Sequence, residues 1–92
     1  MTLDELRNKI DEIDEELIKK LEERFDVVMQ IGEYKKEKGL PIVDHDRELA
    51  KYDRIESLST PLFAEFNRTV FAEIIEVSKE FQEDIVSETL EE

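Results

Sequence analysis

The chain has 92 residues, of which 13 are Lys or Arg and 26 are Asp or Glu, so its formal net charge is −13. This charge repels polyanions, which makes binding to nucleic acid or to an anionic membrane a poor hypothesis. The absence of cysteine excludes a disulfide scaffold, a thiol nucleophile and a cysteine-ligated metal. No apolar run approaches the roughly 20 residues of a membrane-spanning helix, and the start lacks a secretory pattern, so neither membrane insertion nor export is expected.

The composition predicts one all-α domain over residues 1–92. Hydrophobic residues make up 39% of the chain and charged residues 42%, while two Gly and two Pro leave little material for β-turns. Thr2 and Glu5 form a capping-box signature, and apolar residues then recur every three or four positions up to Gly39. The first helix is therefore expected over about 3–38.

Two shorter helices are expected after this one. The second is predicted over about 46–57, after Asp44 or Asp46 as the N-cap. The third is predicted over about 61–86, with Pro61 at its first helical position.

The first helix is too long for a compact domain of this size. At about 1.5 Å per residue it measures about 54 Å. A globule of this chain length has a radius of gyration near ~12 Å and a diameter of roughly 30 Å. The helix should extend beyond its own domain, and a second copy of the chain would help to cover it.

Two cations interrupt the apolar face of this helix. Arg24 and Lys35 follow the same spacing of three and four as Leu21, Val28 and Ile31, so a guanidinium and an ammonium share that face. Their backbones are separated by about 16 Å. Two long side chains that lean toward each other can close such a gap around a small anion.

In the third helix, Ser78 and Gln82 continue the inward spacing of Ile75, so a hydroxyl and a carboxamide line one seam. They could instead form an ordinary buried hydrogen bond. Arg24 could extend its charged end into water, and Lys35 could complement the C-terminal dipole of its helix. On spacing alone these structural alternatives remain open.

The segment before the second helix carries further charge. Asp44, Arg47 and Glu48 could bind a ligand, or they could be an N-cap followed by first-turn charges. His45 is the only histidine and has no second ligand at metal-binding spacing, so no metal site is expected.

Taken together, these residues lie in segments that resemble the all-helical chorismate mutases. The resemblance covers nearly the whole chain, and its most specific parts are Pro41–Glu48 and the pattern Ile-Ile-Glu-x-Ser-x-x-x-Gln at 74–82. The similar segments are LRNKIDEID at 6–14, ER at 23–24, YK at 34–35, GLPIVDHDRE at 39–48 and FAEIIEVSKEFQ at 71–82.

The resemblance implies an intertwined helical homodimer that converts chorismate to prephenate in the cytoplasm, without a cofactor or a metal, in phenylalanine and tyrosine biosynthesis. It implies catalytic roles for Arg7, Arg24, Lys35 and Gln82. It also implies that the substrate is bound by Asp44, Arg47, Glu48 and Ser78.

In that family, the groups at the positions of Lys35 and Gln82 donate hydrogen bonds to the ether oxygen of the breaking bond. Arginines at positions 7 and 24, with the hydroxyl at 78, hold the two carboxylates of the substrate. Arg47, with the acids at 44 and 48, positions its ring and hydroxyl. Lys51 is a departure, because the family more often has an apolar residue there, facing the site from the second helix.

Arg7 requires a second copy of the chain. It lies about 25 Å from Arg24 along the same helix, so one chain cannot bring both residues to one small ligand. In an antiparallel pair of these helices with its centre halfway between positions 3 and 38, Arg7 of one copy is level with about position 34 of the other. A homodimer in which each copy donates Arg7 to the other's site is therefore expected.

Two rival functions stay open. An isochorismate–pyruvate lyase of the same fold has a similarly cationic site, although it resembles this sequence less well around Pro41–Glu48. A non-catalytic helical interaction module is the alternative from a different class, and losses among the eight site positions would be expected for it.

Overall fold

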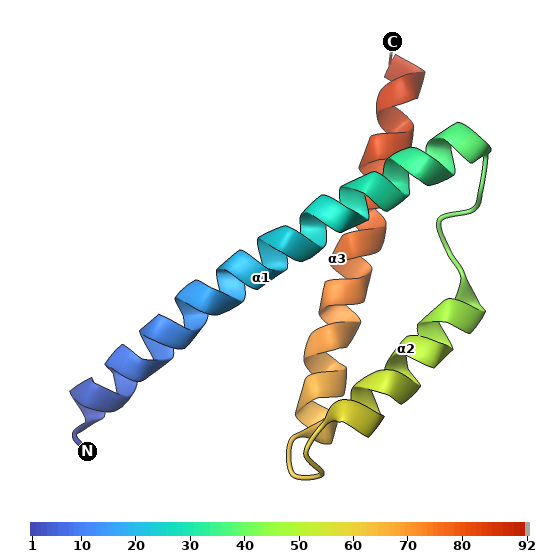
Figure 1. Ribbon diagram of the computed structural model, residues 1–92. Helices are drawn as coiled ribbons and strands as arrows, with labels where there is room; N and C mark the ends of the chain where they lie inside the picture. The colour runs from blue at the N-terminus through green and yellow to red at the C-terminus, as the bar shows by residue number, and fades with distance from the viewer. Residues whose placement is uncertain (92) are drawn as a thin grey trace.

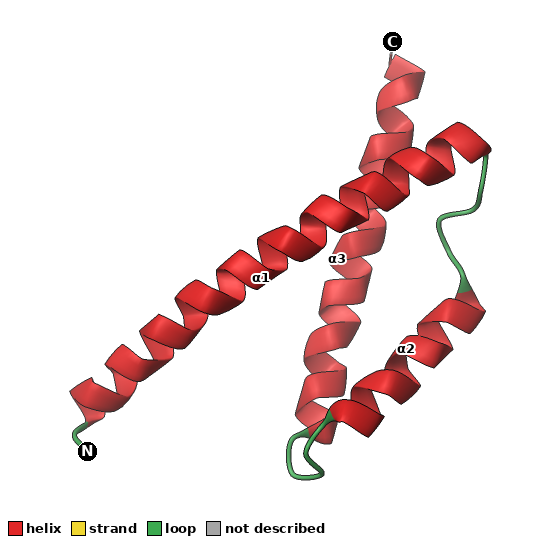
Figure 2. Ribbon diagram, in the orientation of Figure 1, coloured by secondary structure: helices red, strands yellow, loops and turns green. Residues whose placement is uncertain are grey.

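The computed structural model describes residues 1–91, and the side chains of residues 1–87. It contains three α-helices, α1 (Leu3–Lys38), α2 (His45–Leu58) and α3 (Ala64–Glu91). The described residues include no strand, so the predicted all-α class is confirmed (Figures 1 and 2). None of these helices is long and apolar enough within the described residues to cross a membrane.

Both ends of α1 are closed by local hydrogen bonds, and its bounds coincide with the range expected from the sequence. At the start, the Thr2 hydroxyl accepts from the Glu5 amide while the Glu5 carboxylate accepts from the Thr2 amide. At the end, Gly39 adopts φ 66°, and the amides of Gly39 and Leu40 donate to the carbonyls of Lys36 and Lys35. This is a Schellman motif, which ends the helix with a glycine in the left-handed conformation.

Helix α3 begins at Ala64, three residues after the expected start, and continues to Glu91 rather than ending near 86. Residues 61–63 form a turn in which the Phe63 amide donates to the Thr60 carbonyl at 2.8 Å. Pro61 thus initiates a tight turn between two helices rather than the helix itself. The Asn67 side chain donates to the Ser59 hydroxyl at 2.9 Å and ties the first turn of α3 to the end of α2.

Helix α3 packs against both other helices, whereas α1 and α2 have no close backbone contact with each other among the described residues. The buried apolar side chains are Val28, Ile55, Ile75 and Ile85. Gly32 of α1 is also buried, and a Cβ placed there would lie 3.1 Å from Ile85 Cδ1 and 3.4 Å from Gln82 Cγ. The absence of a side chain at Gly32 therefore allows α1 and α3 to approach closely.

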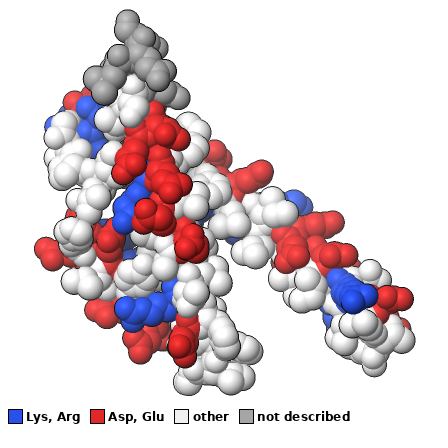
Figure 3. All heavy atoms as spheres, turned by 180° about the vertical axis from the view of Figure 1, so that it is seen from behind, with Lys and Arg blue, Asp and Glu red and all other residues white. Residues whose placement is uncertain are grey.

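The first half of α1 extends away from the other helices as an arm (Figure 1), and Figure 3 shows it standing clear of the rest of the surface. The chain measures 55 Å in its longest dimension and has a radius of gyration of 16.7 Å. Its accessible surface is 7722 Å² at a mass of 10.9 kDa, whereas a compact monomer of that mass exposes about 5,600 Å². The apolar residues of the arm, Leu3, Leu6, Ile10, Ile13 and Leu17, are each 46–60% exposed.

The Schellman motif predicts a specific cost for Gly39→Ala. No atom lies within 4 Å of the position that an added Cβ would occupy, so the effect is conformational rather than steric. We expect the free energy of unfolding to fall by about 1–2 kcal/mol, because an L-residue is disfavoured in the left-handed region. Urea unfolding at fixed protein concentration measures the change. Glu37→Ala, at an exposed helical position, is the control, and an equal effect of both substitutions would contradict the assignment.

Candidate active site

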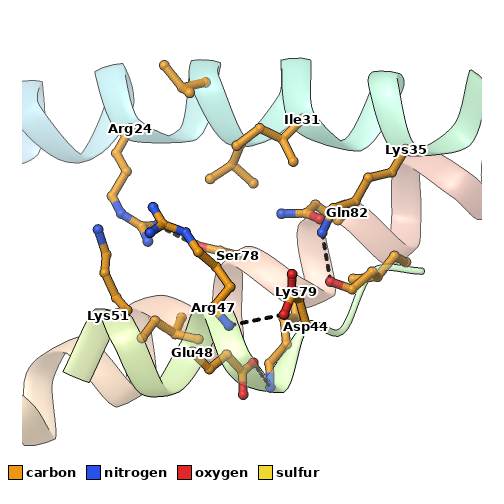
Figure 4. A pocket seen from close by; sticks show the side chains of 14 residues that line it. Arg24, Ile31, Lys35, Asp44, Arg47, Glu48, Lys51, Ser78, Lys79 and Gln82 are labelled. Atoms are coloured by element: carbon orange, nitrogen blue, oxygen red, sulfur yellow. Dashed lines mark hydrogen bonds and ion pairs between the residues drawn. The ribbon is translucent and has the colours of Figure 1, made fainter. Parts of the chain in front are cut away.

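A cavity of about 450 Å³ lies between α1 and α2, with α3 along its inner side (Figure 4). Seven of the eight residues singled out from the sequence line it. These are Arg24 and Lys35 from α1, Asp44, Arg47 and Glu48 at the start of α2, and Ser78 and Gln82 from α3. Apolar side chains from α1, from α3 and from the segment after α1 complete the wall, namely Val27, Val28, Ile31, Ile42 and Ile75.

Arg24 is held at one end of this cavity by α3. Its Nη1 donates to the hydroxyl of Ser78, which in turn donates to the Ile74 carbonyl at 2.6 Å. Ser78 is buried and Arg24 is half-buried. Burial lowers the pKa of the Arg24 guanidinium below its ordinary value, although an arginine stays charged in proteins. The Ser78 contact fixes one nitrogen and leaves the other N–H groups of the guanidinium for a ligand.

Lys35 and Gln82 both line the opposite end of the cavity (Figure 4). The Lys35 ammonium donates to the Ile42 carbonyl at 2.8 Å, which leaves two of its three N–H groups for a ligand. Gln82 is 8% exposed, and its Oε1 is buried with no hydrogen-bond partner among the described residues. A buried carboxamide in that state indicates a ligand or a second chain that completes its hydrogen bonds.

The three charged residues at the start of α2 have different surroundings. Asp44 is the N-cap, and its Oδ1 accepts from the Arg47 amide at 3.0 Å. The Arg47 side chain is exposed and has no ion pair or hydrogen bond within the described part of the chain. Glu48 accepts from the ammonium of Lys79 at 2.9 Å. The N-cap alternative for Asp44 is therefore correct, and Asp44 lines the cavity as well.

Arg7 is the one candidate that the single chain does not bring to the cavity. It lies on the exposed arm of α1, on the same helix as Arg24 but well to its N-terminal side. As expected from the sequence, one chain therefore does not place both arginines at one cavity. The donation of Arg7 to a second copy stays a prediction.

Lys79 was not identified as a site residue from the sequence, although it lines the cavity. Its ammonium bridges Glu48 of α2 at 2.9 Å and Glu76 of its own helix at 3.3 Å. The Glu76 contact follows from i, i+3 spacing. The Glu48 contact joins two helices and leaves no periodic signal in the sequence. Lys51, noted only as a departure from the family pattern, also lines the cavity.

This arrangement suits a small molecule with more than one negative charge. Cations stand at both ends of a partly apolar cavity, while its two carboxylates already have partners in the Arg47 amide and in Lys79. Charged hydrogen bonds from guanidinium and ammonium groups are the common means of holding carboxylates. Among the described residues, no group of three or more His, Cys, Asp or Glu side chains is placed to hold a metal ion.

The fold and cavity define an all-helical protein with a cavity lined by cations from two helices, and comparison with known proteins identifies its family. The chain matches the family described as chorismate mutase type II over residues 6–83. It is 37% identical over 89 residues to a chorismate mutase of Methanocaldococcus jannaschii, which covers 95% of this chain and 90% of the relative. The chain therefore belongs to the type II chorismate mutase family, and the matched range includes all eight candidate residues.

Two larger proteins are similar over part of the chain. A bifunctional chorismate mutase/prephenate dehydratase of Aquifex aeolicus is 39% identical over 61 residues, which are 66% of this chain and 17% of that protein. The T-protein of Haemophilus influenzae is 44% identical over 48 residues, which are 52% of this chain and 13% of that protein. The matches thus correspond to small portions of these two relatives.

The Lys79–Glu48 pair predicts a dependence of stability on alkaline pH. The hydrogen bond to Glu48 raises the pKa of Lys79 by more than burial lowers it. The stability that this pair contributes is therefore fully present below the ordinary pKa of 10.5 and is lost as pH rises through the raised folded pKa. We expect Lys79→Met to lower the free energy of unfolding at neutral pH by at most about 1 kcal/mol, and to flatten the decline above pH 10.5.

Urea unfolding at neutral and alkaline pH measures both effects. Lys20→Met is the matched control, because Lys20 pairs with Glu23 at 3.0 Å and both side chains are at least 66% exposed. The assignment is wrong if the decline in Lys79→Met is as steep as in the unsubstituted chain.

Proposed function

We propose that this cavity is the active site at which the chain rearranges chorismate to prephenate, and that residues 1–92 form a single chorismate mutase domain. The observation that carries the proposal is the placement of Lys35 and Gln82 at one end of a cavity of small-molecule size, with Arg24 at the other end. Family membership supports the same reaction.

The rearrangement breaks a C–O bond and forms a C–C bond in one step, so it needs no nucleophile or base. The protein must select a reactive conformer of a flexible dianion and stabilise the charge that develops as the bonds change. Fixing both carboxylates supplies the orientation. Hydrogen-bond donors fixed where charge develops stabilise the transition state more than the ground state.

Each candidate residue then has a defined role. Arg24, held by Ser78, binds one carboxylate of the substrate. Lys35 and Gln82 donate to the ether oxygen, which gains negative charge in the transition state. The remaining binding residues, Arg47, Asp44 and Glu48, orient the ring and its hydroxyl.

The proposed active form is a homodimer in which Arg7 completes the site of the other copy. The exposed apolar residues of the α1 arm support it, since they would be covered by an antiparallel partner. The chain exposes about 2,100 Å² more than a compact monomer of its mass, and an excess of that size is in the range buried by obligate dimers. The proposed location is the cytoplasm, with prephenate used in phenylalanine and tyrosine biosynthesis.

Mixing two impaired variants tests the reaction and the composite site together. We expect Arg7→Ala and Gln82→Ala each to lower kcat/KM by about a hundredfold or more, because each removes a charged or transition-state contact. Unfolding and refolding an equal mixture makes half of the dimers heterodimers, each with one intact site, so about a quarter of the unsubstituted activity should return. Loss of chorismate absorbance follows the reaction, and acid conversion of prephenate to phenylpyruvate identifies the product.

The control mixture is Gln82→Ala with Arg24→Ala, which both impair the same cavity of their own chain and should not recover. Equal behaviour of the two mixtures would contradict the donation of Arg7. If the folded, unsubstituted protein does not consume chorismate, the proposed reaction is wrong, and turnover of isochorismate would then indicate the lyase.

The proposed role of Gln82 also predicts a pH dependence that the chain itself lacks. A carboxamide donates at any pH, whereas a glutamate at this position donates only when protonated, so Gln82→Glu should be active at acidic pH and lose activity as pH rises. The transition is expected above the ordinary glutamate pKa of about 4.3, because the site is buried. The pH profile of kcat/KM measures this transition, and Gln30→Glu, at an exposed position of α1, is the control. If kcat/KM of Gln82→Glu does not fall as pH rises, the role proposed for Gln82 is wrong.

A further inference from the structure

Lys51 gives the cavity a cation that the roles assigned above do not use. It lies on α2 one turn after Arg47, so its side chain shares the face that lines the cavity. Figure 4 shows its ammonium near the ends of Arg24 and Arg47, at the end of the cavity away from Lys35. Three cations from two helices therefore meet at one end.

No carboxylate offsets this cluster in the described part of the chain. Lys51 has no ion pair or hydrogen bond there, and the two acids of the cavity wall are engaged by the Arg47 amide and by Lys79. Burial lowers the pKa of Lys51 most, and repulsion from Arg47, Arg24 and Arg54 lowers it further. The folded chain thus holds three like charges close together, an arrangement that an anionic ligand would relieve.

We propose that Lys51 is a substrate-binding residue, whose ammonium joins Arg24 in holding a carboxylate of the anionic substrate. This inference rests on the proposed function, and it adds a contact at a position where the resemblance to the family leads us to expect an apolar side chain. A carboxylate is present in the substrate both before and during the rearrangement. The contact therefore lowers KM without raising kcat.

Steady-state kinetics with chorismate test this role. We expect Lys51→Met to raise KM about tenfold and to leave kcat within about twofold, because a contact made equally in ground and transition states is lost. Lys51→Arg keeps the positive charge and should keep KM within about threefold. The matched control is Arg54→Met, which removes one positive charge from the exposed side of the same helix, outside the cavity wall.

Stability separates this role from a structural one. Because Lys51 is repelled by its neighbours, the thermal midpoint of ligand-free Lys51→Met should equal or exceed that of the unsubstituted chain. A lower midpoint would identify Lys51 as a structural residue and overturn the proposal. Lys51→Gln serves for the same comparison if the methionine variant does not fold.

The kinetics of the unsubstituted chain and of Lys51→Met together distinguish a wrong role for Lys51 from a wrong reaction. If the unsubstituted chain turns over chorismate and Lys51→Met has an unchanged KM, or if Arg54→Met raises KM equally, the role of Lys51 is wrong while the reaction stands. If the unsubstituted chain has no turnover at all, the proposed function itself is wrong.

Discussion

The packing of both α1 and α2 on α3, without close contact between α1 and α2, is the constraint on which the site depends. Helix α3 packs against both, and the other two have no close backbone contact with each other, so side chains from three helices face one cavity. The close approach at Gly32 brings Gln82 of α3 to the end of the cavity that Lys35 of α1 also lines. The hydrogen bond from Lys35 to the Ile42 carbonyl holds the segment after α1 against this helix. Two residues later Asp44 caps the start of α2, and it lies in the cavity wall.

The charge of the cavity is opposite to that of the molecule as a whole. The net charge is −13, yet Arg24, Lys35, Arg47 and Lys51 all line one cavity, whose carboxylates already have partners. Figure 3 shows many acidic side chains on the outer surface. At physiological ionic strength, exposed charges are screened beyond ~8 Å. The cavity can therefore attract an anion in spite of the acidic surface.

The length of α1 explains why a single chain leaves apolar side chains exposed and Arg7 far from the cavity. The C-terminal half of α1 supplies Arg24 and Lys35 and packs on α3, as Phe25 and Phe81 show with ring centroids 6.3 Å apart. The N-terminal half carries Arg7 and an apolar face that stays exposed in the described part of the chain. A second copy would bury that face and supply the missing arginine by the same contact, so assembly and activity would be coupled.

The sequence by itself determined the local features: the three helices, the capping box at Thr2 and Glu5, the glycine that ends α1, and the shared faces of Arg24 with Lys35 and of Ser78 with Gln82. These follow from helical period and backbone preference, which act over a few residues. Only the tertiary structure decided that Lys79 pairs with Glu48, that Lys51 joins Arg24 and Arg47, and that Pro61 begins a turn rather than α3. Each of these depends on how two helices meet, and residues that meet across helices share no spacing in the sequence.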